Sequence, residues 1–123
     1  YSADQNAVAL PRAKPFRDER IPKFLDWFEL VLQRNPAGDA HLVGDRLSYA
    51  DLSLFQLVDG LNYAFPKATA QALKATPAVH RLHANMRRRQ RVADYLHSAR
   101  RIAFNEDGIF RRYPELDAAP QAR

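Results

Sequence analysis

The sequence contains no cysteine, and this absence excludes several classes of function. Disulfide frameworks, thiolate zinc sites and cysteine nucleophiles all require a thiol. Apolar runs fall far short of the roughly 20 residues that a membrane-spanning helix needs. No charged stretch followed by an apolar one marks a signal peptide near the start. We therefore expect a protein without a membrane segment, located in the cytoplasm.

The residues that are present have the composition of an ordinary globular domain. The 123 residues are 46% hydrophobic and 27% charged, which is close to the average of folded proteins and allows one hydrophobic core. The first residue is Tyr1 and not methionine. We therefore expect the chain to be a piece of a longer protein.

Helical spacing dominates the apolar pattern, and alternation typical of strands never persists beyond a few residues. The pattern predicts an all-α fold, a multi-helix bundle of about five helices. Apolar residues recur three and four positions apart in residues 17–34, which predicts a helix that starts or kinks near Pro22. Pro11 and Pro15 interrupt residues 1–16, which we interpret as a connector. Residues 17–100 then form the helical domain, and residues 101–123 an irregular tail.

The start of one helix is marked by a specific pattern. Ser48 is followed three positions later by Asp51, the spacing of a capping box, in which each side chain accepts the backbone N–H of the other residue. Leu47 and Leu52 have the spacing of a hydrophobic staple. The pattern predicts a helix that begins at Tyr49. Apolar residues around its whole axis predict that this is the central, buried helix.

Weaker signals continue the helical pattern toward the C-terminus. Gly60, inside the central helix, predicts a close neighbour helix or a bend. Residues 67–75 are rich in alanine and predict a short helix or a helical turn. Thr76 and Pro77 are typical of an N-cap followed by the first helical residue, and a last short apolar stripe lies in residues 92–99.

Three segments, taken in chain order, also resemble a known family. The first runs from Ile21 to Glu29 and leads into the apolar stretch that ends at Leu32. The second, which is the most specific, runs from His41 to Asp51 and contains the capping box. The third comprises residues 77–86 and 92–96. These segments resemble, over residues 17–96, the C-terminal helical domain of the glutathione transferases.

The resemblance implies a two-domain enzyme of detoxification that conjugates glutathione, its co-substrate, to small electrophilic compounds. A thioredoxin-like N-terminal domain binds glutathione and activates its thiol in that family, and the helical domain supplies the electrophile pocket. We therefore expect no catalytic residue and no metal in this chain, and no activity from the chain alone. Because the helix before Tyr1 lines that pocket in the family, we expect Tyr1 to bind substrate. An alternative is a transferase-like interaction scaffold without conjugation activity.

The resemblance also implies that the full-length protein is a homodimer. The family pairs its subunits across a surface to which the helix of residues 17–34 contributes. Trp27 and Leu30 lie beside the core stripe of that helix, so we expect both side chains to be partly uncovered in an isolated chain.

Three further features suggest other functions. Ser48 and Asp51 could form a hydroxyl–acid catalytic pair, but the capping box accounts for both and no histidine lies close in sequence. His80 and His83 lie one helical turn apart, but no third ligand accompanies them, so we expect no metal site. Residues 80–112 contain nine arginines and three acids. Because no module that reads a nucleic-acid groove accompanies them, we interpret these arginines as a solvated surface, with nucleic acid an unlikely partner.

Overall fold

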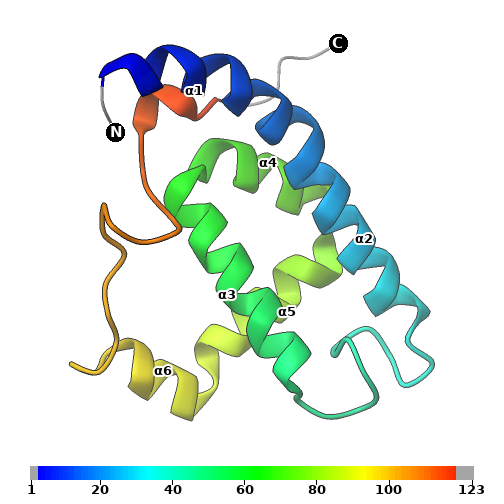
Figure 1. The fold of residues 1–123 in the computed structure, drawn as a ribbon. Helices are drawn as coiled ribbons and strands as arrows, with labels where there is room; N and C mark the ends of the chain where they lie inside the picture. The colour runs from blue at the N-terminus through cyan, green and yellow to red at the C-terminus, as the bar shows by residue number, and fades with distance from the viewer. Residues whose placement is uncertain (1–2, 119–123) are drawn as a thin grey trace.

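The computed structural model describes residues 3–118, and within these residues it contains helices and irregular segments but no strand. The expected all-α bundle is confirmed. In chain order the elements are α1 (Ala3–Pro15), the π-helical turn η1 (Phe16–Arg20), α2 (Ile21–Arg34), α3 (Tyr49–Ala64), α4 (Pro66–Ala75), α5 (Pro77–Arg88), α6 (Gln90–Leu96) and the 3-10 helix η2 (Pro114–Leu116). Because η1 joins α1 to α2, five helical rods make up the bundle (Figure 1).

The stretch interpreted as a connector is helical, and that expectation was wrong for α1. Pro11 and Pro15 both lie inside α1, where each removes one backbone hydrogen bond. Packing offsets this cost, because Ala13 is buried and lines a hollow together with Phe65 and Leu116, residues distant in sequence. Tertiary contacts therefore maintain a helix that the two prolines argue against.

The long helix widens by one residue just before Pro22. The N–H of Ile21 reaches the carbonyl of Phe16, five positions earlier, instead of the usual four. A proline inside a helix clashes with the carbonyl four positions before it, and a wider turn relieves such a clash. The irregularity expected near Pro22 is thus a π-helical turn, through which α1 and α2 form one rod.

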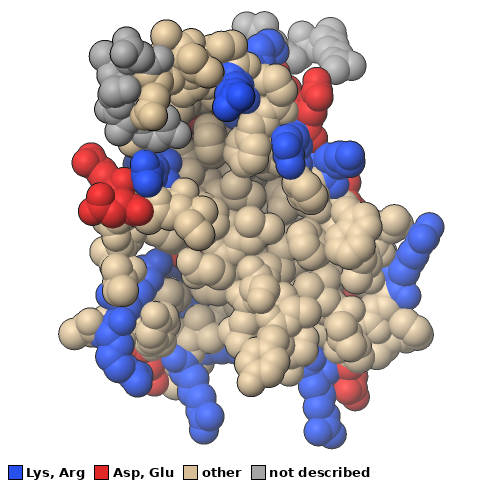
Figure 2. Space-filling view, viewed as in Figure 1, with Lys and Arg blue, Asp and Glu red and all other residues tan. Residues whose placement is uncertain are grey.

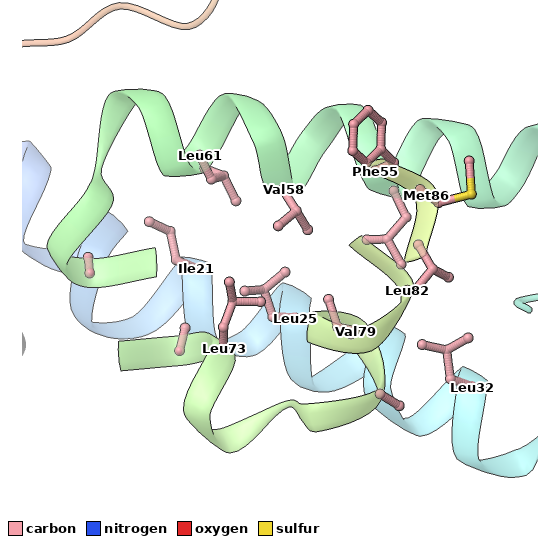
Figure 3. Packing of buried hydrophobic residues seen from close by; sticks show 14 residues of the cluster. Ile21, Leu25, Leu32, Phe55, Val58, Leu61, Leu73, Val79, Leu82 and Met86 are labelled. Carbon is pink, nitrogen blue, oxygen red and sulfur yellow. The ribbon is translucent and has the colours of Figure 1, made fainter. Parts of the chain in front are cut away.

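Helix α3 lies at the centre of the bundle and begins at Tyr49, as the capping box predicts. Its buried apolar side chains form one core with residues of α2, α4 and α5, and Figure 3 shows Val58 and Leu61 pointing toward Ile21, Leu25, Leu73 and Val79. The first turn is only partly enclosed, however, because Tyr49 is 89% exposed and Leu52 is 37% exposed, whereas Asp51 is fully buried. Only the middle and the end of α3 have the surroundings expected for a buried helix.

Distant carboxylates cap two of the helices. Glu29 of α2 is buried and accepts the backbone N–H groups of Ala78 and Val79 in the first turn of α5. Thr76 is the N-cap and Pro77 the first helical residue, as expected. The Thr76 hydroxyl does not cap the helix, however, because it donates backward to the carbonyl of Ala72 at 3.0 Å. A negative charge at the first turn also interacts favourably with the helix dipole.

No helix within residues 3–118 combines the length and the apolar character that a membrane crossing requires.

Candidate functional site

The capping-box carboxylate connects the loop before α3 to the helix. Asp51 is fully buried, and it accepts hydrogen bonds from His41 Nδ1 at 2.9 Å, from the N–H of Leu42 at 2.8 Å and from the N–H of Ser48 at 3.2 Å. The capping-box arrangement is present, but its serine half is weak, since Ser48 Oγ is buried and has no well-formed hydrogen bond. Asp51 therefore organises the loop as well as the helix end.

The structure places a histidine beside this pair, which sequence proximity did not reveal. His41 donates to Asp51. A Ser–His–Asp relay would also require the serine hydroxyl to contact the imidazole, and among the described residues Ser48 Oγ makes no hydrogen bond to His41. The geometry of Ser48 and Asp51 supports a structural role.

The sequence offered two other candidates, Tyr1 and the pair His80 and His83. Tyr1, expected to bind substrate, lies outside the described residues. His83 is buried and faces α3, whereas His80, one turn earlier on α5, is exposed. Nowhere in residues 3–118 do three or more histidine, aspartate or glutamate side chains form a group that could hold a metal ion.

His83 instead belongs to a charged cluster around Asp59, which is buried in α3. Asp59 Oδ1 lies 3.1 Å from His83 Nε2 and 2.6 Å from Arg87 Nη1, and Asp59 Oδ2 lies 3.2 Å from Arg101 Nη2. Burial by itself would raise the pKa of Asp59. The hydrogen bond from His83 and the charges of Arg87, His83 and Arg101 outweigh burial, and they lower the pKa below its ordinary value.

The cluster attaches the C-terminal segment, residues 97–118, to the bundle. After α6 this segment runs back along α3 toward α1 (Figure 1). Arg101 reaches Asp59 and also lies over the ring of Phe104, which stacks on Tyr63 of α3 with the ring centres 4.7 Å apart. Residues 101–118 of the expected tail contain no regular element before η2, but Arg101 and Phe104 attach them to the central helix.

The neighbour expected at Gly60 belongs to the same segment. A methyl group at Gly60 would overlap the ring of Phe110, so the close approach is made by the segment and not by another helix. Farther along, Asp117 accepts the backbone N–H groups of Lys67 at 2.9 Å and Ala68 at 3.2 Å, which caps α4. The segment is therefore anchored near both of its ends.

Two pockets lie between the C-terminal segment and the helices. The first, here the η2 pocket, has a volume of about 410 Å³ and is lined by Phe16, Leu61, Ala64, Phe65, Gly108, Ile109, Phe110, Arg111, Tyr113 and Leu116. The second, here the α6 pocket, has a volume of about 440 Å³ and is lined by Leu47, Leu52, Phe55, Gln56, Arg91, Val92, Tyr95, Leu96, Arg101, Ile102 and Phe104. Both pockets have mainly apolar walls and sizes suited to small molecules.

The basic side chains are unevenly distributed on the face that Figure 2 shows. On the face shown in Figure 2 the Lys and Arg side chains project mostly from the edges, while the centre, over α2 and α3, is largely uncharged. Trp27 is 58% exposed and Leu30 is 41% exposed on α2. The expectation that both side chains are partly uncovered is confirmed.

The Asp59 cluster has one signal in the sequence, a charged residue within the apolar run of the central helix. Asp59 stands among Leu57, Val58, Gly60 and Leu61, where a charged residue needs a partner because α3 is central to the bundle. Its partners come from positions 24, 28 and 42 residues farther along the chain. No local spacing could identify them.

Comparison with known proteins gives a consistent family. Residues 1–99 match the family model described as glutathione S-transferase, C-terminal domain. A glutathione S-transferase of Plasmodium yoelii yoelii is 39% identical over 51 residues, which is 42% of this chain and 23% of the relative. A glutathione S-transferase of Plasmodium falciparum (isolate 3D7) is 33% identical over 57 residues, 43% of this chain and 27% of the relative. The matched part thus spans about a quarter of each curated relative.

The family match includes both the capping box of α3 and the carboxylate of α2 that caps α5. The first contact holds the loop before α3 in place, and the second holds the start of α5. Both contacts lie within the matched residues. The chain belongs to the glutathione S-transferase family, and it forms the C-terminal helical domain of that family.

Proposed function

We propose that this chain is the substrate-side helical domain of an enzyme that conjugates glutathione to small electrophilic compounds. The observation that carries the proposal is the family match over residues 1–99, which includes the helices that frame the pockets. An apolar pocket is what an electrophile of low polarity requires, because burial of apolar surface drives its binding.

The η2 pocket is the better candidate for the electrophile. Aromatic side chains from three parts of the chain surround it, namely Phe16, Phe65 and Phe110, and Tyr113 adds a hydroxyl group. It shares Phe16, Phe65 and Leu116 with the hollow beside α1. It is therefore close to α1, and the family resemblance implies that the helix before Tyr1 lines the electrophile pocket.

This chain contributes binding surface, and in the proposal glutathione and its activation are supplied by a thioredoxin-like domain. Among the described residues, Asp59 is the carboxylate with a clearly shifted pKa, and it is occupied by three basic partners. We assign no catalytic residue and no metal ion to this chain.

We also propose a homodimer that acts in the cytoplasm to remove electrophiles. The exposed apolar side chains of α2, Phe24, Trp27 and Leu30, support pairing across this helix. A stable dimer interface needs a cluster of this kind at its centre, because buried aromatic residues carry much of the binding free energy.

The test compares the full-length protein with residues 1–123 alone, using 1-chloro-2,4-dinitrobenzene and glutathione. We expect conjugation above the uncatalysed rate from the full-length protein only. Turnover by residues 1–123 alone would contradict the assignment of the thiol-activating group to another domain. Binding of a protein partner by a full-length protein that is inert with several electrophiles would favour the scaffold alternative.

A pair of matched variants tests the pocket in the full-length enzyme. Ile109 lines the η2 pocket and Ile102 lines the α6 pocket, and both are more than 80% exposed. We expect Ile109→Ala to raise KM for an apolar electrophile about threefold or more, because it removes apolar contact area. Ile102→Ala should leave KM unchanged. Equal effects of the two variants would reject the η2 pocket as the electrophile site.

A further inference from the structure

The net positive charge of the chain is concentrated at one end of the helical bundle. Residues 87–101 contain six arginines and a single acid, Asp94, and they carry a formal net charge of +5. This equals the formal net charge of all 123 residues, so the charges of the remaining residues cancel. The segment covers the end of α5, all of α6 and the turn after it, and α6 lies at the lower end of the bundle in Figure 1, while α1 lies at the upper end.

The fold uses only some of these arginines. Arg87 and Arg101 pair with the buried carboxylate of Asp59. Three others are exposed, and residues 3–118 supply no hydrogen bond or ion pair to their side chains, namely Arg89, Arg91 and Arg100. Their guanidinium groups are therefore available to a partner.

Exposed apolar side chains lie beside the available arginines. Ile102 is 83% exposed and Tyr95 is also exposed, and both line the mouth of the α6 pocket together with Arg91. Tyr49, in the exposed first turn of α3, lies one helical turn before Leu52, which lines the same pocket. Large apolar side chains that gather at an exposed surface indicate an interaction site. A merely solvated basic surface, as the sequence suggests, does not account for them.

We propose that this end of the bundle binds the surface of a membrane that contains anionic lipids. The residues involved, here the α6 surface, are Tyr49, Arg89, Arg91, Tyr95, Arg100 and Ile102. The arginines pair with the lipid headgroups, and the apolar side chains enter the interfacial layer beneath them, so the protein lies on the bilayer without crossing it. This inference goes beyond the proposed function and does not depend on it.

The apolar residues favour a lipid surface over other polyanions. A guanidinium group forms charge-assisted hydrogen bonds with any phosphate, so the arginines alone do not distinguish a lipid from a nucleic acid. An exposed isoleucine such as Ile102 has no apolar partner along a phosphodiester backbone. The interfacial layer of a bilayer accepts aliphatic side chains, and tyrosine is enriched at that depth.

The experiment measures partition of the full-length protein onto vesicles by sedimentation, without glutathione. One set of vesicles contains phosphatidylcholine alone, and the other also contains about 30% phosphatidylglycerol. We expect the partition coefficient to be about 10-fold or more higher on the anionic vesicles, because each basic residue near such a surface contributes about fivefold. Raising the salt concentration to about 0.5 M should abolish most of this difference by screening.

A pair of charge-matched variants locates the surface. The combined substitutions Arg89→Gln, Arg91→Gln and Arg100→Gln should lower the partition coefficient on anionic vesicles about 10-fold or more. The control combines Arg12→Gln, Lys67→Gln and Lys74→Gln, which removes the same charge from exposed positions of α1 and α4, and it should retain most of the binding. Thermal melts check that both variants are folded.

A matched pair of isoleucine variants tests the apolar part of the surface. Ile102→Ser should lower the partition coefficient about threefold or more, because a hydroxyl group gains little from entering the interfacial layer. Ile109→Ser changes an exposed residue that lines the η2 pocket, and it should change binding less than about twofold.

Four outcomes would overturn the proposal. These are equal binding to the two kinds of vesicle, equal losses in the two charge variants, equal losses in the two isoleucine variants, and tighter binding of a short DNA duplex or of polyglutamate than of anionic vesicles. The last outcome would assign the arginines to a nucleic acid or to an acidic protein. Because glutathione is absent from the measurement, none of these outcomes bears on the conjugation activity proposed above.

Discussion

Glu29 Oε1, in the middle of α2, accepts the backbone N–H of Ala78 at the start of α5, 49 positions along the chain, at a distance of 3.0 Å. Its second oxygen, Oε2, accepts the N–H of Val79 at 2.9 Å. One buried carboxylate thus satisfies two backbone donors that α5 cannot satisfy within itself. It also fixes the position of α5 relative to α2.

The contact between Glu29 and the start of α5 predicts that even a conservative substitution of Glu29 lowers the free energy of unfolding. Glu29→Gln keeps the shape but replaces one acceptor oxygen by a donor, so a buried N–H loses its partner. We expect the free energy of unfolding to fall by about 1 to 3 kcal/mol in urea titrations. Asp26→Asn, an equivalent change at an exposed position of the same helix, should alter stability by less than about 0.5 kcal/mol. Equal losses would show that the cap contributes nothing.

The two halves of the capping box should contribute unequally. Asp51→Ala removes three hydrogen bonds from a fully buried carboxylate, and we expect it to cost about 3 kcal/mol or more. Ser48→Ala should cost about 1 kcal/mol or less, because Ser48 Oγ has no well-formed hydrogen bond. Melting temperatures and urea midpoints measure both changes. A variant with unchanged stability and altered substrate choice would contradict the structural role.

The Asp59 cluster predicts sensitivity to acid. Burial favours a higher pKa for Asp59, but His83, Arg87 and Arg101 together lower it below the ordinary value of 3.8. As the pH falls, the unfolded chain therefore takes up this proton first. The stabilisation is fully present above the ordinary pKa and is lost as the pH falls through the lower pKa of the folded state.

Unfolding free energies measured against pH test the cluster. The wild type should lose stability below about pH 4, and Asp59→Asn should remove part of this dependence, because it lacks the titrating carboxyl group. Asp94→Asn, at an exposed position of α6, is the control and should keep the wild-type profile. A profile for Asp59→Asn parallel to that of the wild type would refute the linkage.

Gly60 predicts a double-mutant result. In an exposed helix Gly→Ala is stabilising by about 1 kcal/mol, but a methyl group here overlaps the ring of Phe110. We expect Gly60→Ala to destabilise the protein by about 1 to 3 kcal/mol. In the Phe110→Ala background the same change should be neutral or stabilising, since the obstruction is gone. Additive free energies in the two backgrounds would show that the C-terminal segment does not pack on α3 in solution.

The exposed face of α2 predicts the effect of a charge on assembly. In the full-length protein Trp27→Lys should weaken the proposed dimer about 10-fold or more in sedimentation experiments, because it places a charge among apolar side chains. Ile109→Lys changes a residue that is 96% exposed elsewhere and should leave the dimer intact. A wild-type protein that sediments as a monomer at all concentrations would reject the dimer.

Short-range patterns predicted the parts of the fold that depend on neighbouring residues. Ser48 and Asp51 lie one helical turn apart, so their spacing alone predicted where α3 begins. The apolar stripe of α2 predicted that Leu25 and Leu32 would be buried and that Trp27 would not. The same patterns failed for α1, because proline is locally unfavourable whatever contacts the helix makes elsewhere.

By itself the sequence determined the helical class, the start of the central helix and the resemblance to the glutathione transferases. Each of these depends on residues within a few turns of one another. Only the tertiary structure decided which carboxylate caps which helix, because the partners of Glu29 and Asp117 lie 49 or 50 positions away. It also brought Arg91 and Arg101 to one apolar pocket. Local spacing has no information about such pairs, since their distance is set by the packing of α3, α5 and α6 around a common core.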